Sequence, residues 1–167
     1  MRVRDSMENH DLLLDAQISG NTAVSTASSV KSIHIDSEHK LFTGLLYLRP
    51  AADDSIGGDL NVVRFRRDLT AAEHRRRYDG MFVDDAVTEH VSTVPYRRNT
   101  LIVFVNGLEA LHGVTVRQPT DHLRLFLNLV CESRVKLFDV PQAWQIRAAK
   151  LPRLIKKRLM RVAGRGA

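Results

Sequence analysis

The sequence predicts a mainly β protein, built as a closed barrel or a double-sheet jelly roll and followed by a C-terminal amphipathic helix. About seven short apolar segments are separated by Gly, Pro and Asn turn signals, which is typical of sandwiches and barrels. Helical periodicity is almost absent before residue 142. The strands therefore do not alternate with helices, which argues against a βαβ fold.

Length and composition predict one globular domain. The chain has 167 residues, of which 44% are hydrophobic and 26% charged, enough for a single core. The single cysteine, Cys131, excludes an internal disulfide and a cysteine-rich zinc site. No apolar run reaches the roughly 18 residues of a membrane span, and residues 1–20 lack the apolar centre of a signal peptide. We expect a cytoplasmic protein.

Three regions follow from the order of the segments. Residues 1–29 are polar and rich in Ser and Thr near their end, and only residues 11–15 suggest a short ordered piece, so we expect a loosely ordered arm. Residues 30–140 form the β domain, and residues 141–167 form a basic helical tail. After the strand that carries His34 and Asp36, the predicted strands are residues 41–48, 60–65, 87–95, 101–105, 112–116 and 123–130. Residues 101–105 are continuously apolar, which indicates a strand buried on both faces.

Two segments carry helical signals. Within residues 68–78, Thr70 and Glu73 have the spacing of a capping box, and the basic cluster at residues 74–77 that follows is typical of an exposed helical face. Apolar residues recur at helical steps in residues 142–162, with a break expected beside Pro152. From Arg147 onward the tail has eight basic residues and no acid. A solvated helix face explains these charges better than contact with nucleic acid or a membrane.

Three residues form a candidate metal site. His34 and Asp36 are two positions apart, so an extended strand places both side chains on one face. His112 begins a distant strand that a closed sheet can bring alongside. Two imidazoles and one carboxylate make the facial triad that suits Fe(II) and leaves positions open. Metal binding needs neutral imidazoles, so we expect it to weaken in mild acid.

A candidate carboxylate-binding residue begins a later strand. Arg124 shares one strand face with Phe126 and Asn128 by alternation. A guanidinium binds a carboxylate through two parallel hydrogen bonds, as a dicarboxylic co-substrate would require. Arg117 is nearer to His112 but has the opposite strand parity, so it ranks second.

The order of these motifs resembles one enzyme family. The H-x-D at His34, the segments LFTGLLYL, GGDL and VPYRRNTLIVFVNGLEALHGV, and the arginine that leads an apolar strand are similar to the Fe(II)- and 2-oxoglutarate-dependent oxygenases, in the prolyl 4-hydroxylase-like branch. The resemblance extends over residues 33–130. It implies a double-stranded β-helix, the jelly roll of that family.

The resemblance also implies a site and an activity. Iron would be held by His34, Asp36 and His112, and the distal carboxylate of 2-oxoglutarate by Arg124 and the Tyr47 hydroxyl. We assign Asn128 to the same co-substrate pocket. With O2 as second co-substrate, such enzymes hydroxylate an unactivated C–H bond and release succinate and CO2. The organic substrate would be a peptide, a saccharide or a small metabolite.

Two differences from the family pattern lead to further expectations. The separation of His112 from Arg124 is slightly longer than usual, so residues 119–122 should bulge or loop. Only 33 residues precede His34, where relatives carry helices and strands that complete the larger sheet. The arm could replace these elements, the chain could form a homo-oligomer, or the site could be truncated. The alternative function is a catalytically silent jelly-roll binding module.

Overall fold

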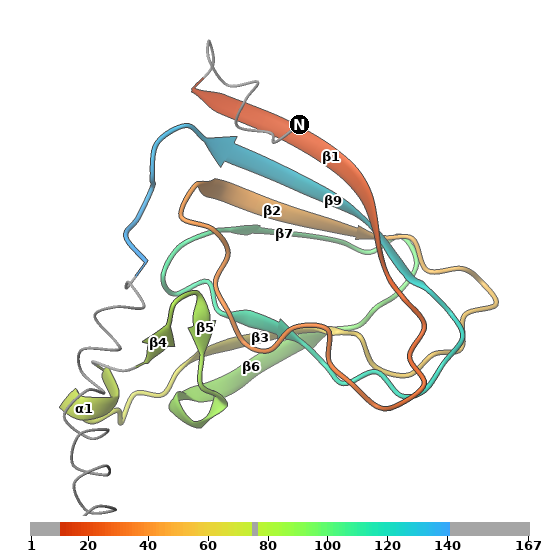
Figure 1. Cartoon of the computed structure of the whole chain (residues 1–167), viewed down its shortest axis with the longest axis horizontal. Helices are drawn as coiled ribbons and strands as arrows, with labels where there is room; N and C mark the ends of the chain where they lie inside the picture. The colour runs from red at the N-terminus through yellow and green to blue at the C-terminus, as the bar shows by residue number, and fades with distance from the viewer. Residues whose placement is uncertain (1–10, 75–76, 141–167) are drawn as a thin grey trace, which may run out of the picture.

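A computed structural model describes residues 11–74 and 77–140 and confirms a mainly β protein with antiparallel sheets. Figure 1 shows two sheets, one above the other, and a short hairpin at the left. Helix in the described residues is limited to α1 (Ala71–His74) and the 3-10 turn η2 (Asp85–Val87). No helix in this part of the chain is long and apolar enough to cross a membrane.

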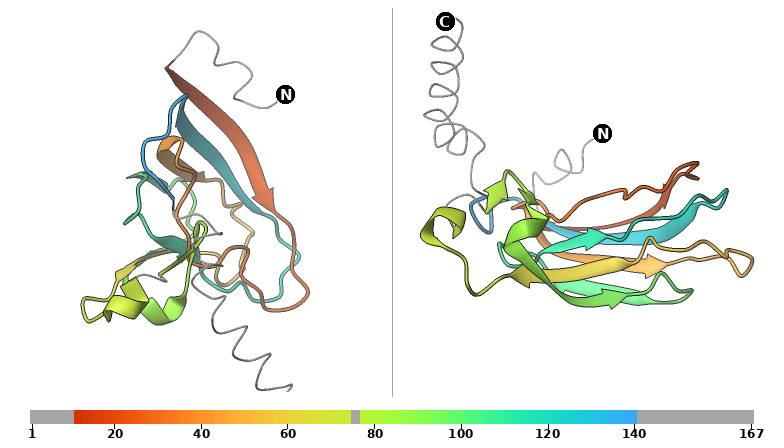
Figure 2. Two further views of the ribbon diagram at one scale, coloured as in Figure 1. Left: turned by 60° about the vertical axis from the view of Figure 1, so that its left-hand side comes forward. Right: turned by 90° about the horizontal axis from the view of Figure 1, so that it is seen from below.

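The larger sheet has four strands and the smaller has three. The larger sheet has the order β1-β9-β2-β7, with strands at Leu12–Asn21, Arg124–Ser133, Lys40–Tyr47 and Leu101–Val105. The smaller has the order β6-β3-β8, with strands at Thr88–Val94, Leu60–Phe65 and His112–Val114. The hairpin joins β4 (Tyr78–Asp79) to β5 (Phe82–Val83). The turned views show the layered arrangement of the strands (Figure 2).

The predicted strands from residue 41 onward are confirmed within a few residues at each end. The strand expected around His34 and Asp36 is not formed: this segment has only isolated bridges, at His34. Residues 119–122 lie outside any strand, as the long His112–Arg124 spacing predicts. The capping box is also present: the Glu73 N–H donates to Thr70 Oγ1 at 3.2 Å, and the Thr70 N–H donates to Glu73 Oε2 at 2.8 Å. The helix that it begins is only four residues long. The tail helix predicted for residues 142–162 lies outside the described residues.

The first strand differs from the expected loose arm. β1 pairs with β9 over its whole length, from Leu12 opposite Ser133 to Asn21 opposite Arg124. Its outward apolar side chains are exposed, with Leu14 at 72% and Ile18 at 77%. The segment therefore gains little from burial, and backbone pairing to β9 determines its conformation. In the sequence only residues 11–15 suggest a short ordered piece, because most of the rest of the strand is polar or small.

The prediction that residues 101–105 are buried on both faces is wrong. β7 is an edge strand that pairs with β2, and its side chains alternate, with Leu101, Val103 and Val105 exposed. The outer face of the larger sheet is accordingly apolar and uncovered in the described residues. A continuous apolar run does not distinguish a strand covered on both faces from this arrangement.

The main hydrophobic cluster lies beside the metal-site segment. It joins Ile35 to residues of β3, of the segment between β3 and β6, and of the position just before β8: Val63, Phe65, Leu69, Tyr78, Val83, Val87 and Leu111. The Tyr78 hydroxyl donates to the Leu108 carbonyl, which satisfies its polar end. Ile35 is fully buried, so its packing fixes the backbone between His34 and Asp36.

Candidate metal centre

Three metal-ligating side chains converge in the structure as the sequence predicts. One ligand atom from each of His34, Asp36 and His112 lies within 4.8 Å of the other two. All three residues are buried. Within the described residues this is the one group of three or more His, Cys, Asp or Glu side chains with such a separation. The arrangement can hold one metal ion.

A backbone bridge holds the two histidines side by side. The His34 N–H donates to the His112 carbonyl at 2.9 Å, and the His112 N–H donates to the His34 carbonyl at 3.1 Å. Directly opposed residues of an antiparallel pair project their side chains to the same face, and the two ring centroids are 4.3 Å apart. Asp36 follows two residues later, and its Oδ1 lies 3.9 Å from His34 Nε2.

Each imidazole is oriented through its Nδ1 atom. His34 Nδ1 lies 2.7 Å from the Ser32 carbonyl, and His112 Nδ1 lies 2.9 Å from the Ala110 carbonyl. A carbonyl can only accept, so each Nδ1 carries the proton and donates it. The lone pair of each Nε2 is then available for a metal, as in most metal-binding histidines.

The Asp36 carboxylate is held by its other oxygen. Oδ2 accepts from the Thr43 hydroxyl at 2.7 Å and from Lys40 Nζ at 3.4 Å. The Thr43 hydroxyl in turn accepts from Asn106 Nδ2 at 3.0 Å. These contacts fix the carboxylate plane and leave Oδ1 facing the histidines, which is the usual role of the residues behind metal ligands.

At neutral pH all three candidate ligands are in the deprotonated form that binds a metal. Burial lowers the pKa of His34 to about 4, and the neighbouring His112 adds to this shift. Burial likewise lowers the pKa of His112. For Asp36, burial opposes ionisation, but Lys40 and the Thr43 hydroxyl outweigh it, so the pKa of this carboxyl is lowered. Both imidazoles are therefore neutral to lower pH than a free imidazole, and the expected loss of binding in acid moves to lower pH.

A cavity of about 270 Å³ joins the metal-ligand set to Arg124. His34, Asp36 and His112 line it together with Arg124 and Asn128, so residues from both sheets form its walls. Its volume lies just below the roughly 300–1,000 Å³ of pockets that enclose a drug-sized ligand. The cavity can accommodate a small molecule.

Arg124 is a buried cation without an acidic partner in the described part of the chain. Its Nε donates to the Gly58 carbonyl at 2.6 Å, and its two terminal nitrogens donate to Asn21 Oδ1 at 3.2 Å and to the Tyr47 hydroxyl at 3.1 Å. A guanidinium has five N–H donors, so two remain. The rings of Tyr47, Tyr96 and Phe126 lie 5.0, 5.1 and 5.1 Å from its Cζ and compensate part of this buried charge. An anion bound to the remaining donors would compensate more of it.

Tyr47 lies against this guanidinium. It is fully buried, and burial raises its pKa, so the hydroxyl stays protonated. Because this hydroxyl accepts the bond from Arg124, its own hydrogen remains to be donated to a second acceptor. Arg124 and Tyr47 together can bind a carboxylate.

Gly58 makes room for the Arg124 side chain. Its φ of 79° lies in the left-handed region, which favours glycine. A Cβ at this position would lie 3.1 Å from Arg124 Cδ and 3.1 Å from Arg117 Cγ. The Gly57-Gly58 turn of the sequence is therefore also part of the arginine site.

Two other residues considered from the sequence lie elsewhere. Arg117 is 1% exposed and does not line the cavity. Its guanidinium donates to the carbonyls of Thr22 and His122, each at 2.9 Å. It therefore connects the residues just after β1 to the loop before β9. The His122 ring faces Asp54 instead, with Nε2 3.4 Å from Oδ1.

Sequence reasoning missed four residues around the carboxylate. Thr43, Asn106, Lys31 and Lys40 surround Asp36 or support it. Strand parity could have indicated Thr43, because it lies on the same strand face as Leu45 and Tyr47. Asn106 stands in an Asn-Gly pair that reads only as a turn signal, and its contact with Thr43 joins distant segments.

Comparison with known proteins does not identify a family or a function for this chain. No protein-family model matches the chain, and no curated protein is significantly similar to it. Because a β-rich fold hosts many functions, function has to be argued from the geometry and chemistry of the cavity.

Proposed function

We propose that the protein is an Fe(II)- and 2-oxoglutarate-dependent oxygenase with a double-stranded β-helix fold. The observation that carries the proposal is one cavity that joins a buried His–Asp–His set to a buried arginine, which has no acidic partner among the residues that the structure describes. The motif resemblance to the prolyl 4-hydroxylase-like branch, which includes the same residues, agrees with it. A lone metal site would not require the arginine.

The residues fit both groups. His34 and His112 would bind Fe(II) through Nε2 and Asp36 through Oδ1, a nitrogen and oxygen set that suits this metal. Arg124 and Tyr47 would bind the distal carboxylate of 2-oxoglutarate, because a guanidinium with two remaining donors matches the two carboxylate oxygens. Asn128 lines the same cavity.

The bound groups would supply the oxidation that hydroxylates a C–H bond, with release of succinate and CO2. The chain contributes positioning. Thr43 and Lys40 hold the carboxylate of Asp36, and the bridged backbones of His34 and His112 fix the two rings. Four apolar side chains form part of the cavity lining: Leu45, Leu60, Phe104 and Phe126.

Metal-dependent binding of 2-oxoglutarate tests the proposal. Isothermal titration calorimetry of the Mn(II)-loaded protein should show one 2-oxoglutarate site, which disappears after chelation of the metal. The Asp36→Ala variant should bind neither ligand, while Asp84→Ala, at an exposed turn, should behave as wild type. Absence of any 2-oxoglutarate binding to folded, metal-loaded protein would favour the catalytically silent binding module.

A further inference from the structure

The cavity carries more positive charge than the proposed metal and co-substrate compensate. Among its lining residues, Lys31, Lys40 and Arg124 are basic and Asp36 is the acidic one. A divalent ion and a dianionic co-substrate cancel each other. Two positive charges are therefore left in a partly desolvated space, where uncompensated charge is unfavourable.

Lys31 is the better placed of the two lysines to bind a ligand. Lys40 Nζ is within hydrogen-bond distance of Asp36 Oδ2, at 3.4 Å, and its side chain is 21% exposed. Lys31 Nζ lies 3.9 Å from Asp36 Oδ1, beyond hydrogen-bond distance, and its side chain is 43% exposed. Oδ1 is the oxygen that would bind the metal. A bound metal ion would therefore neutralise the carboxylate charge that lies nearest to the Lys31 ammonium.

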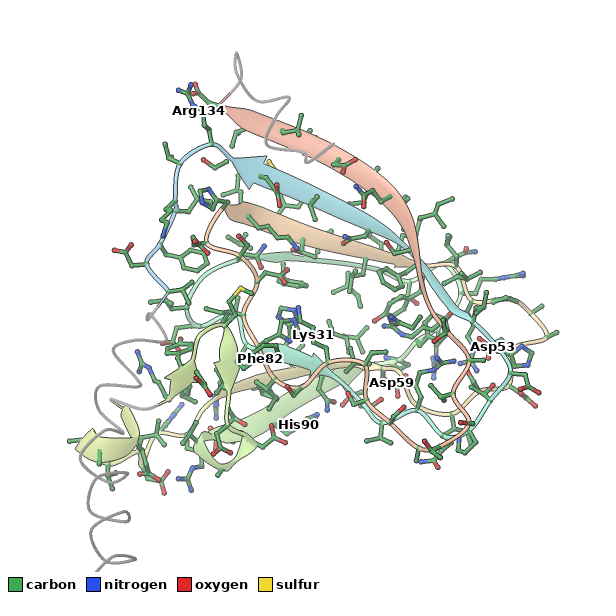
Figure 3. All side chains as sticks on the ribbon, viewed as in Figure 1. Lys31, Asp53, Asp59, Phe82, His90 and Arg134 are labelled. Carbon is green, nitrogen blue, oxygen red and sulfur yellow. The ribbon has the colours of Figure 1, made fainter. Side chains whose placement is uncertain are left out.

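The backbone of Lys31 is fixed although its side chain is half exposed. The Val114 N–H donates to the Lys31 carbonyl at 3.1 Å, and the Ser29 hydroxyl donates to the Val114 carbonyl at 2.7 Å. Lys31 is thereby attached to the end of β8, just after His112. Its side chain lies between the two sheets (Figure 3), so its ammonium can reach a molecule beside the metal ligands.

We propose that the substrate is a small organic anion whose charged group is bound by Lys31. This inference rests on the proposed function, because it assigns Arg124 to the co-substrate and Lys31 to the substrate. The cavity volume of about 270 Å³ must be shared with the co-substrate, so only a small part of the substrate enters. Apolar lining residues, Val30 and Val114 among them, suit a short hydrocarbon portion next to the anionic group.

Matched acids and amides test the assignment. Protein loaded with Mn(II) and saturating 2-oxoglutarate is titrated with benzoate and benzamide, with butyrate and butyramide, and with phenyl phosphate, and binding is followed by calorimetry. The acids should bind at least about tenfold more tightly than their amides, the value expected for a hydrogen bond to a charged group. Phenyl phosphate shows whether a phosphate is preferred to a carboxylate.

Two lysine variants assign the preference to one residue. In Lys31→Met the preference for acids should fall at least fivefold, while Lys136→Met should keep it, because Lys136 is half exposed and pairs with Glu38 outside the cavity. Three results would overturn the assignment: no binding of any acid to the wild type, equal binding of acids and amides, or a preference that survives Lys31→Met. The 2-oxoglutarate titration in the same samples reports separately on the proposed function.

Discussion

His34 and His112 exchange both backbone hydrogen bonds of an antiparallel pair, at 2.9 and 3.1 Å. Two candidate metal ligands from distant segments are thus joined by main chain, before any metal is involved. Their ring orientations are set by separate bonds from Nδ1 to carbonyls. The site is therefore preorganised, which lowers the entropic cost of binding an ion.

Loss of the Thr43 hydroxyl should weaken metal binding. Thr43→Val preserves shape but removes the 2.7 Å hydrogen bond to Asp36 Oδ2. Residues behind metal ligands typically contribute about 10–100-fold in affinity, and we expect a loss in this range for Mn(II), measured by calorimetry. Thr43→Ser keeps the hydroxyl and should stay close to wild type. Equal affinities for the valine and serine variants would show that this bond does not position the carboxylate.

Arg124→Gln should reduce 2-oxoglutarate affinity without reducing metal affinity. Removing one partner of a buried charged pair costs about 2–5 kcal/mol, which corresponds to a loss of at least about 30-fold. The control is Arg64→Gln, because Arg64 is exposed and pairs with Glu89 on the surface. Calorimetric titrations with Mn(II) and then 2-oxoglutarate separate the two affinities. A parallel loss of metal binding would mean that Arg124 supports the fold instead.

Tyr47→Phe should have a smaller effect in the same assay. The ring packs edge-on against Tyr96 at a centroid distance of 5.0 Å, and phenylalanine keeps this contact. Only the hydroxyl between Arg124 and the expected carboxylate is lost. One neutral hydrogen bond contributes about 0.5–1.5 kcal/mol, so affinity for 2-oxoglutarate should fall about two- to tenfold. Unchanged affinity would remove Tyr47 from the co-substrate site.

The strands that alternate or carry clear turn signals could be predicted from the sequence. β3 and β7 begin and end where the sequence predicts, because Gly57-Gly58 and Asn106-Gly107 mark adjacent turns. β1 could not be predicted beyond a short ordered piece at residues 11–15, since its outward Leu14 and Ile18 are exposed and its order comes from pairing with β9. Local patterns do not report a strand whose stability is supplied by a distant partner.

The candidate site was predictable where a motif or strand parity applied. The alternation that pairs His34 with Asp36 needs only local geometry. Strand position and parity indicated His112 and Arg124, and the family resemblance supplied Tyr47. Lys31 and Asn106 were not predictable, because their roles depend on contacts between segments far apart in the chain. The alternation that favoured Arg124 over Arg117 agrees with the structure, which places Arg124 in the cavity and Arg117 outside it.

The metal-free protein should lose stability in acid through His34. Its pKa is about 4 when folded, against about 6.5 in an unfolded chain. The unfolded state then binds more protons between these pH values, so the free energy of unfolding falls as pH drops from about 6.5 to about 4. The shift corresponds to roughly 3 kcal/mol.

Urea unfolding of metal-free protein at pH 7 and pH 4.5 measures this loss. His34→Gln cannot be protonated in this range, so it should lose roughly 2–3 kcal/mol less than the wild type between the two pH values. The comparison needs only the difference between the two proteins, since other groups titrate in both. An identical loss would mean that the pKa of the His34 imidazole is the same in the folded and the unfolded protein.

The most direct test is the visible spectrum of the anaerobic protein with Fe(II) and 2-oxoglutarate. Wild-type protein should develop a weak charge-transfer band when both are present, and neither alone should produce it. His34→Ala should lack the band, while His90→Ala, at an exposed position on β6, should retain it (Figure 3). A folded wild-type protein that binds Fe(II) and gives no band with 2-oxoglutarate would contradict the assignment of this cavity.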